Sequence, residues 1–257
     1  MGNQNYAPLV RDMVWSFSRI SAFEDCPYRW YLSYIREKKG DDMFYASYGS
    51  FMHGILADYY AGKLSADELP GVFLSRFRDD VRGARPSPEI AARYVEEGSA
   101  YLRSPFRPDG EIIGVEKRVR FSVYDKPFVG TIDLLVRDER GFVLIDHKSR
   151  AMKPRSGKSK PTTTDIEIDE MLKQLYLYAE AVQQEFGETP YKLCFNCFRN
   201  GVLIEEPFDE RAFVAAKDWA REEIERIEAE DEFEADPEWF RCRYLCGYHT
   251  YCDEWRE

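Results

Sequence analysis

Residues 130–148 read GTIDLLVRDERGFVLIDHK, and this stretch decides how the chain folds. Two apolar runs flank the polar turn Asp138-Glu139-Arg140-Gly141, a pattern that predicts a β-hairpin. Side chains alternate between the two faces of a strand, so Asp146 and Lys148 should share a face. The hairpin returns the second strand beside the first, so Asp133 and Asp146 can converge on one cation.

Two carboxylates and a lysine at the end of a hairpin suit the hydrolysis of a phosphodiester bond. Carboxylate oxygens bind Mg²⁺ or Mn²⁺, and the metal activates water and neutralises charge on the phosphate. The ammonium group of Lys148 would orient the nucleophile or stabilise the transition state. The same residue types are also common at ordinary strand ends. The hairpin by itself therefore leaves both explanations open.

The hairpin lies in the middle of a mixed pattern of helices and strands. Helical patterns come first, with Ser18 a candidate cap and Pro27 the start of a second helix or a kink. They cover residues 16–36, 47–62 and 65–103, with breaks near Pro70 and at 85–88. Strands at 111–123, 128–136 and 142–149 predict an antiparallel meander, followed by a helix at 168–186, strands at 191–198 and 202–206, and a charged helix from Asp209. This order predicts an α/β fold with helices flanking the sheet.

The length of 257 residues is at the upper edge of what one domain usually holds. We expect one elaborated domain over residues 1–257. It would consist of a helical N-terminal block (1–105), a core that carries the sheet (106–208), and a C-terminal helix with metal-binding cysteines (209–257). The sequence shows neither an internal repeat nor a low-complexity linker.

Composition restricts the cellular setting and the partners. No apolar run reaches the 18 residues of a membrane helix, and the N-terminus lacks the regions of a signal peptide, so we expect a cytoplasmic protein without a membrane partner. A net charge of −11 argues against a protein that coats nucleic acid. Charge is unevenly distributed, however, because residues 148–160 are basic and residues 218–238 are strongly acidic. Any bound DNA should meet the first segment and avoid the second.

Six cysteines in a reducing compartment favour metal binding or burial over disulfides. Cys242-x3-Cys246-x5-Cys252 is a compact ligand set that lacks a fourth thiolate, which Cys26 could supply; His249 is a possible substitute ligand. Four thiolates bind an iron–sulfur cluster or zinc, and simple burial is the remaining alternative. Cys194 and Cys197 occupy opposite faces of an apolar strand, so we expect both to be buried.

Taken together, the motifs resemble the PD-(D/E)XK nuclease superfamily, and within it the RecB/AddB-like branch with the iron–sulfur CRISPR-adaptation exonucleases. The resemblance extends over nearly the whole chain. Its motifs are Ser18-x-x-Ser21 before Cys26-Pro27-Tyr28, Gly49-x-x-x-His53, Gly130-x-Ile132-Asp133, Asp146-x-Lys148, Gln174-x-x-x-Tyr178 and the C-terminal cysteines. The resemblance implies a restriction-endonuclease-like mixed sheet flanked by helices, with the nuclease core at 106–208.

The same resemblance assigns roles to individual residues. Asp133 and Asp146 would be metal ligands, together with the imidazole of His53 and the backbone carbonyl of His147. Lys148 would be the catalytic lysine, with Glu116 as a further acidic member. Gln174 and Tyr178 lie one helical turn apart and would position DNA or water. Taken singly, His53 would be an ordinary core histidine, and Gln174 and Tyr178 ordinary helix residues.

The resemblance also implies cofactors and partners. Cys26, Cys242, Cys246 and Cys252 would hold a [4Fe-4S] cluster that staples the two ends of the chain, with zinc as the alternative metal. The substrate would be single-stranded DNA or DNA ends, in recombination, repair or CRISPR adaptation. The sequence contains no Gly-x4-Gly-Lys-Ser/Thr loop, so any helicase would be a separate protein. The rival hypotheses are a catalytically idle DNA-binding or assembly subunit and a metal protein whose carboxylates are structural.

Overall fold

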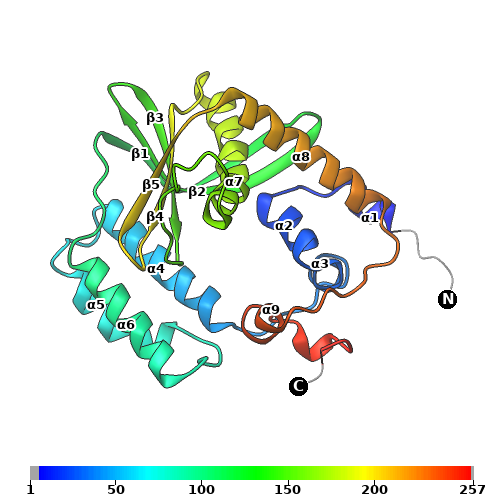
Figure 1. Cartoon of the computed structure of the whole chain (residues 1–257), viewed down its shortest axis with the longest axis horizontal. Helices are drawn as coiled ribbons and strands as arrows, with labels where there is room; N and C mark the ends of the chain where they lie inside the picture. The colour runs from blue at the N-terminus through cyan, green and yellow to red at the C-terminus, as the bar shows by residue number, and fades with distance from the viewer. Residues whose placement is uncertain (1–5, 256–257) are drawn as a thin grey trace.

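The computed structural model describes residues 6–255 of the chain. A mixed sheet forms its centre, with helices packed on both faces (Figure 1). The strands are β1 (Glu111–Val123), β2 (Lys126–Asp138), β3 (Gly141–Lys148), β4 (Lys192–Cys197) and β5 (Val202–Pro207). The helices are α1 (Ala7–Arg11), α2 (Phe17–Asp25), α3 (Pro27–Tyr34), α4 (Phe44–Tyr60), α5 (Leu69–Asp80), α6 (Pro88–Leu102), α7 (Thr163–Phe186), α8 (Glu210–Ala229), α9 (Trp239–Tyr244) and the short 3₁₀ helix η1 (His249–Tyr251).

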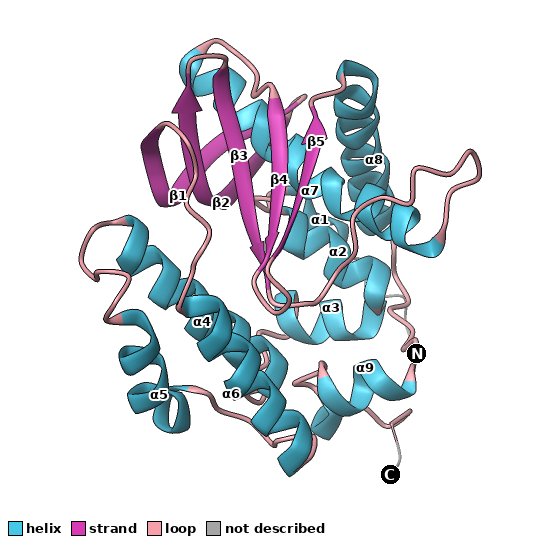
Figure 2. Cartoon of the chain, turned by 60° about the vertical axis from the view of Figure 1, so that its left-hand side comes forward, coloured by secondary structure: helices cyan, strands magenta, loops and turns pink. Residues whose placement is uncertain are grey.

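The strands lie in the sheet in their order along the chain, β1 to β5 (Figure 2). β1, β2 and β3 form the predicted antiparallel meander. β4 runs parallel to β3, because the chain crosses over through α7, and β5 returns antiparallel to β4. The prediction of an α/β mixed sheet flanked by helices is therefore confirmed.

The central strands bury apolar side chains on both faces, which explains their continuous apolar runs. Leu134 and Ile145 belong to a buried cluster with α4, α5 and α6. Leu135 and Leu144, one residue along each strand, belong to a second cluster with α2, α7 and α8. None of these four side chains is more than 1% exposed. The sheet is thus the shared wall between two helical layers, as Figure 1 shows.

The N-terminal helical pattern splits at Cys26, where α2 ends and α3 begins with Pro27 in its first turn. The expected cap is wrong by two residues: Ser16, not Ser18, caps α2, and its side chain accepts a hydrogen bond from Arg19 N at 3.2 Å. Ser16 is extended, as an N-cap requires, whereas Ser18 is already helical.

The long helix α7, between β3 and β4, begins earlier than its apolar pattern indicates, at Thr163 instead of 168. Thr162 and Asp165 form a capping box, in which each side chain accepts a hydrogen bond from the other's backbone N–H. The polar first turn has no apolar stripe, so periodicity alone missed it.

The basic loop at 149–162 is anchored to the protein rather than free. Arg155 is paired with Glu206 at 2.7 Å and with Asp169 at 2.6 Å. Met152 is buried, and its carbonyl accepts a hydrogen bond from Asn200. Three lysines of this loop remain exposed: Lys153, Lys158 and Lys160. Arg155 therefore holds the loop in place, and the expectation that DNA meets this basic segment stays a prediction.

The C-terminal segment returns to the N-terminal helices, and α9 and η1 lie beside α3 (Figure 1). Asp41 N donates to Gly247 O at 2.7 Å, and Tyr28 N donates to Glu234 O at 3.1 Å. The Phe233 ring stacks on Trp30 with centroids 5.5 Å apart. In the described part of the chain, no helix combines the length and apolar character needed to cross a membrane.

Gly130 couples the hairpin to α7. A Cβ atom at this position would lie 2.4 Å from Cε1 of Tyr178, closer than any real contact allows. The Tyr178 ring is 8% exposed and therefore packs directly against the backbone of β2. Two motifs that are distant in the sequence thus form a single contact, because only glycine leaves room for the ring.

We predict that Gly130→Ala destabilises the protein by about 1–3 kcal/mol, the usual cost of overpacking a closed contact. Urea unfolding followed by circular dichroism measures this change. Gly71→Ala is the matched control: it lies in α5 with nothing within 4 Å of its Cβ position. There alanine should stabilise the helix by up to about 1 kcal/mol. Equal effects of the two substitutions would contradict the proposed contact.

Candidate metal centre and active site

The acidic residues meet where the pairing of β2 with β3 ends. The β2–β3 ladder runs from Asp138↔Gly141 to Leu134↔Ile145 and stops there. Asp133 and Asp146 are the next residue on each strand, so the strands separate at this point. Asp133 Oδ2 instead accepts a hydrogen bond from the backbone N–H of His147 at 2.7 Å.

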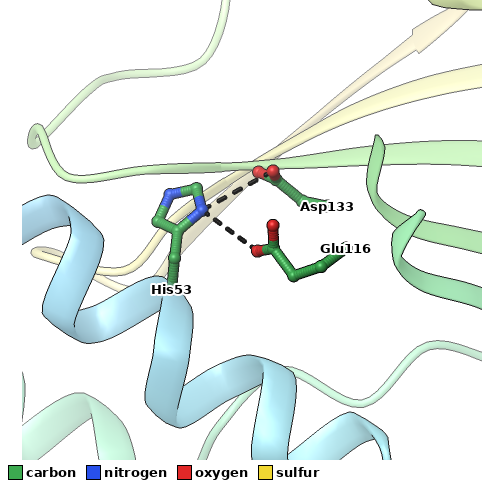
Figure 3. Close-up of side chains that lie close together, drawn as sticks. All are labelled: His53, Glu116 and Asp133. Atoms are coloured by element: carbon green, nitrogen blue, oxygen red, sulfur yellow. Dashed lines mark ion pairs between the residues drawn. The ribbon is translucent and has the colours of Figure 1, made fainter. Parts of the chain in front are cut away.

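His53 approaches this point from α4. Its Nε2 lies 2.9 Å from the carbonyl oxygen of His147. Its Nδ1 lies 3.5 Å from Asp133 Oδ1 and 3.6 Å from Glu116 Oε1 (Figure 3). One turn earlier in α4, Gly49 faces Ser149, and a Cβ atom there would lie 3.3 Å from Ser149 Oγ. The glycine of the Gly49-x-x-x-His53 motif therefore lets α4 come close to the end of β3.

Glu116 joins the site from β1 through an unusual backbone conformation. Its φ of 46° is left-handed, within a strand that otherwise pairs regularly at Val115↔Leu134 and Lys117↔Ile132. For a residue with a Cβ this conformation costs on the order of 1–2 kcal/mol. At this left-handed position the Glu116 carboxylate points toward His53 (Figure 3). Such strain is typical of functional positions, and no sequence pattern reveals it.

Asp146 and Lys148 lie side by side on the face of β3 that α7 covers. Lys148 Nζ is 2.9 Å from Asp146 Oδ2 and also donates to Gln174 Oε1 at 2.9 Å. Gln174 Nε2 donates in turn to the Tyr178 hydroxyl at 3.4 Å. The predicted residues of β3 and α7 thus form one chain of contacts, in which the lysine is held between a carboxylate and an amide.

The charges of the site shift the pKa values of its residues in different directions. Burial favours neutral His53, but hydrogen bonds to Asp133 and Glu116 and the charges of Asp133 and Asp146 outweigh it and raise the pKa of His53 to about 10. Burial also raises the pKa of Asp146, helped by the charge of Asp133 and opposed by Lys148. The pKa of Asp133 is lowered, because the contact with His53 outweighs burial. Negative charge that keeps the partly buried imidazole of His53 protonated also attracts cations.

The donor set fits a divalent cation. Ligand atoms of His53, Glu116 and Asp133 all lie within 4.8 Å of one another. Because His53 Nε2 contacts the His147 carbonyl at 2.9 Å, Nδ1 is the ring nitrogen that faces the carboxylates of Asp133 and Glu116. Carboxylate and carbonyl oxygens suit Mg²⁺ and Mn²⁺.

The His147 side chain points away from this cluster, toward the layer of α4 and α6. Its ring stacks on Tyr60 at 5.5 Å, and Asn196 lies 3.1 Å from its Nδ1. Burial lowers the pKa of the ring to about 4, so it is neutral. Only the backbone of His147 faces the site. Asn196 was not among the residues expected near the site, although a polar residue inside the apolar run of residues 193–198 is a signal for such a role.

The structure also places the cysteines. Cys26 caps α3, and its sulfur accepts hydrogen bonds from Arg29 N at 3.5 Å and from Asp236 N at 3.4 Å. Burial raises the pKa of Cys246, and nearby Cys26 and Cys242 contribute to the increase. Cys252 follows η1, next to the Tyr251 carbonyl that accepts the Tyr28 hydroxyl at 3.3 Å. These cysteines are partly exposed and lie where the two ends of the chain meet.

Cys194 and Cys197 behave as the alternation of a strand predicts. Cys194 is buried in the cluster with α4, α5 and α6, and Cys197 in the opposite cluster. Burial raises the pKa of the Cys194 thiol to about 12 and that of Cys197 to about 11. His249 Nδ1 lies 2.9 Å from the carbonyl of Cys246, so this nitrogen is occupied within its own turn.

The sheet is mixed, and helices pack on both of its faces. Carboxylates lie where β2 and β3 separate, and Lys148 lies on the same strand as Asp146. These features are typical of the metal-dependent nucleases with this fold. Sequence comparison agrees, since the model of the PD-(D/E)XK nuclease superfamily matches residues 14–253. The chain belongs to this superfamily, whose members are nucleases that use divalent metals.

Comparison with solved structures supports the fold. A protein from Eubacterium rectale, to which exonuclease activity is provisionally assigned, aligns with a TM-score of 0.54 and 12% identity. The alignment covers 100% of this chain and 95% of that protein. The structure of SSO0001 aligns with a TM-score of 0.35 and 16% identity, over 93% of this chain and 86% of that one, and adds no argument. No functionally curated protein matches the chain.

We predict that Mn²⁺ raises the unfolding temperature of the protein, because an ion that binds only the folded state stabilises it by mass action. At a hundredfold excess over Kd the gain is about 2.7 kcal/mol, or several degrees. His53→Ala, Glu116→Gln and Asp133→Asn should reduce the shift, whereas Asp67→Asn, an exposed carboxylate, should keep it. A full shift in Asp133→Asn, measured by scanning calorimetry with Mn²⁺ and with EDTA, would place the ion elsewhere.

Proposed function

We propose that this chain is a Mg²⁺- or Mn²⁺-dependent deoxyribonuclease of the RecB/AddB-like branch, acting as an exonuclease on single-stranded DNA or DNA ends. The observation that carries the proposal is the meeting of Glu116, Asp133, His53 and the His147 carbonyl beside the ion pair of Asp146 and Lys148. The first group offers ligands for a cation, and the second offers an ammonium group fixed beside them.

Each residue has a distinct task in this proposal. A divalent ion, when bound, would supply a water of lowered pKa and neutralise charge on the phosphate. Asp133 and Asp146 provide negative charge for that ion. Lys148, held by Asp146 and Gln174, places a positive charge where the pentavalent phosphate develops negative charge. Tyr178 holds Gln174 in turn, so its role is positioning.

The proposed substrate reaches the site through a cleft on the α4 side. This cleft has a volume of about 580 Å³, and its lining includes His53, Glu116 and Ser149. The loop that follows Ser149 carries the exposed lysines 153, 158 and 160. We propose that these lysines contact phosphates, whereas Arg155 does not, because it is paired internally.

We predict Mn²⁺-dependent degradation of labelled single-stranded DNA by the purified protein. Asp146→Asn and Lys148→Ala should reduce the rate by about a hundredfold or more, because transition-state charge stabilisation accounts for effects of this size. Substrates blocked at the 5′ or the 3′ end establish exonuclease polarity, and a circular strand separates exonuclease from endonuclease action. A native rate in Asp146→Asn would refute the assignment, and an inactive wild type with intact fold would favour an idle DNA-binding or assembly subunit.

We also propose that Cys26, Cys242, Cys246 and Cys252 hold a [4Fe-4S] cluster that joins the ends of the chain. The support is the contact between the Cys26 region and the C-terminal segment, together with four thiolates that suit such a cluster. Zinc is the alternative occupant. A separate helicase or another recombination, repair or CRISPR-adaptation protein would be the functional partner, as the proposed branch implies.

We predict that protein purified without oxygen is brown and contains about four iron and four sulfide per chain. Cys26→Ala should bleach the colour and lower the unfolding temperature, because metal binding is coupled to folding. Cys197→Ala, at a buried position outside the proposed set, should keep the colour. Iron and zinc are measured by plasma emission spectroscopy. Stoichiometric zinc would replace the iron assignment, and full metal content in Cys26→Ala would refute the joining of the ends.

A further inference from the structure

An aromatic cluster stands on the surface where α9 meets the start of α4. It consists of Tyr45, Trp239, Phe240 and Tyr244. The Tyr45 ring lies 6.0 Å from Phe240 and 6.2 Å from Tyr244, and Tyr244 lies 5.6 Å from Trp239, centroid to centroid. Trp239 is 63% exposed and Phe240 is 44% exposed. Two such large apolar side chains at adjacent positions of a short helix are unusual on a solvent-exposed surface.

The aromatic cluster reaches the cleft of the metal centre through one of its members, Tyr45. Tyr45 lines the same cleft as His53 and Glu116. A second hollow of about 430 Å³ lies along the same helix and shares Ala46 and Ser50 with the first. Together they form a groove that runs from the metal centre along α4 to the C-terminal segment.

Packing does not account for the exposed position of Trp239. α9 is fixed to the protein by Tyr244 and Phe240, whose rings contact Tyr45. Trp239 contacts only Tyr244 among these rings, edge to face, and leaves most of its surface open. Glu238, the nearest carboxylate in sequence, is engaged as the cap of α9, where it accepts hydrogen bonds from two backbone N–H groups.

A single strand of nucleic acid has the chemistry that matches this surface. Its unpaired bases stack on exposed aromatic rings, and each stack contributes to affinity without regard to base identity. A duplex cannot use the surface in this way, because its bases are already stacked inside the helix. The groove ends at carboxylates proposed to act on a phosphodiester, so its occupant should be the molecule that is cut there.

We propose that Trp239 and Phe240 are a base-stacking platform, which holds a single DNA strand whose scissile phosphate lies at the metal centre. This inference rests on the proposed nuclease function and adds the path of the strand. It also gives the C-terminal segment a second role, because that segment carries both the cysteines and the platform.

The test is the binding of a short fluorescein-labelled oligo(dT), measured by anisotropy in an Asp146→Asn background so that the strand stays intact. Trp239→Ala should raise Kd about fivefold or more, the lower range for loss of one stacked base. Trp239→Phe should recover most of the affinity, because a ring remains. Leu74→Ala, which removes an apolar side chain that is 54% exposed on α5, should leave Kd unchanged. Oligo(dT) should also quench tryptophan fluorescence in the parent but much less in Trp239→Phe.

An unchanged Kd in the Trp239→Ala, Phe240→Ala double variant, with its circular dichroism spectrum intact, would overturn the platform. Equal Trp239 dependence for a blunt duplex of the same length would also overturn it. Failure of the nuclease function has a different signature: the wild-type protein would bind oligo(dT) through Trp239 but leave it uncut in Mn²⁺. Failure of the platform alone would leave cleavage by the wild type in place.

Discussion

The main constraint on this structure is that three negatively charged carboxylates lie close together in a partly buried site of the sheet. Glu116, Asp133 and Asp146 come from three neighbouring strands, and they meet where the pairing of β2 with β3 ends. Their mutual repulsion opposes folding, and burial increases it. A protonated His53 and Lys148 offset it in the absence of a metal. The fold therefore maintains a concentration of negative charge that a divalent cation would relieve.

Packing contacts elsewhere in the molecule hold these carboxylates in position. Gly130 admits the Tyr178 ring, which fixes α7 against β2, and Gly49 lets α4 approach Ser149. On the far face, Asn196 contacts the buried ring of His147, whose backbone N–H and carbonyl face the site. The close packing of two helical layers against one sheet thus sets the positions of groups that would otherwise move apart.

Much of the fold around the site was predictable from local sequence patterns, because strand alternation and a hairpin turn fix which nearby residues share a face. The alternation in Asp146-His147-Lys148 predicted which side chains share a face, and the turn before Gly141 predicted the meander. Buried Cys194 and Cys197 on opposite faces follow from the same rule. The early start of α7 at Thr163 did not, since a polar first turn has no periodic apolar signal.

By itself, the sequence determined the order of the main helices and strands, the antiparallel meander, and the shared face of Asp146 and Lys148. These features depend on residues that are close along the chain. Tertiary structure alone decided the left-handed backbone of Glu116, the anchoring of Arg155 by acidic residues of β5 and α7, and the contact of α9, through Tyr244, with Tyr45 of α4. Each of these depends on segments far apart in the sequence, and their relative positions are set only when the two helical layers pack on the sheet.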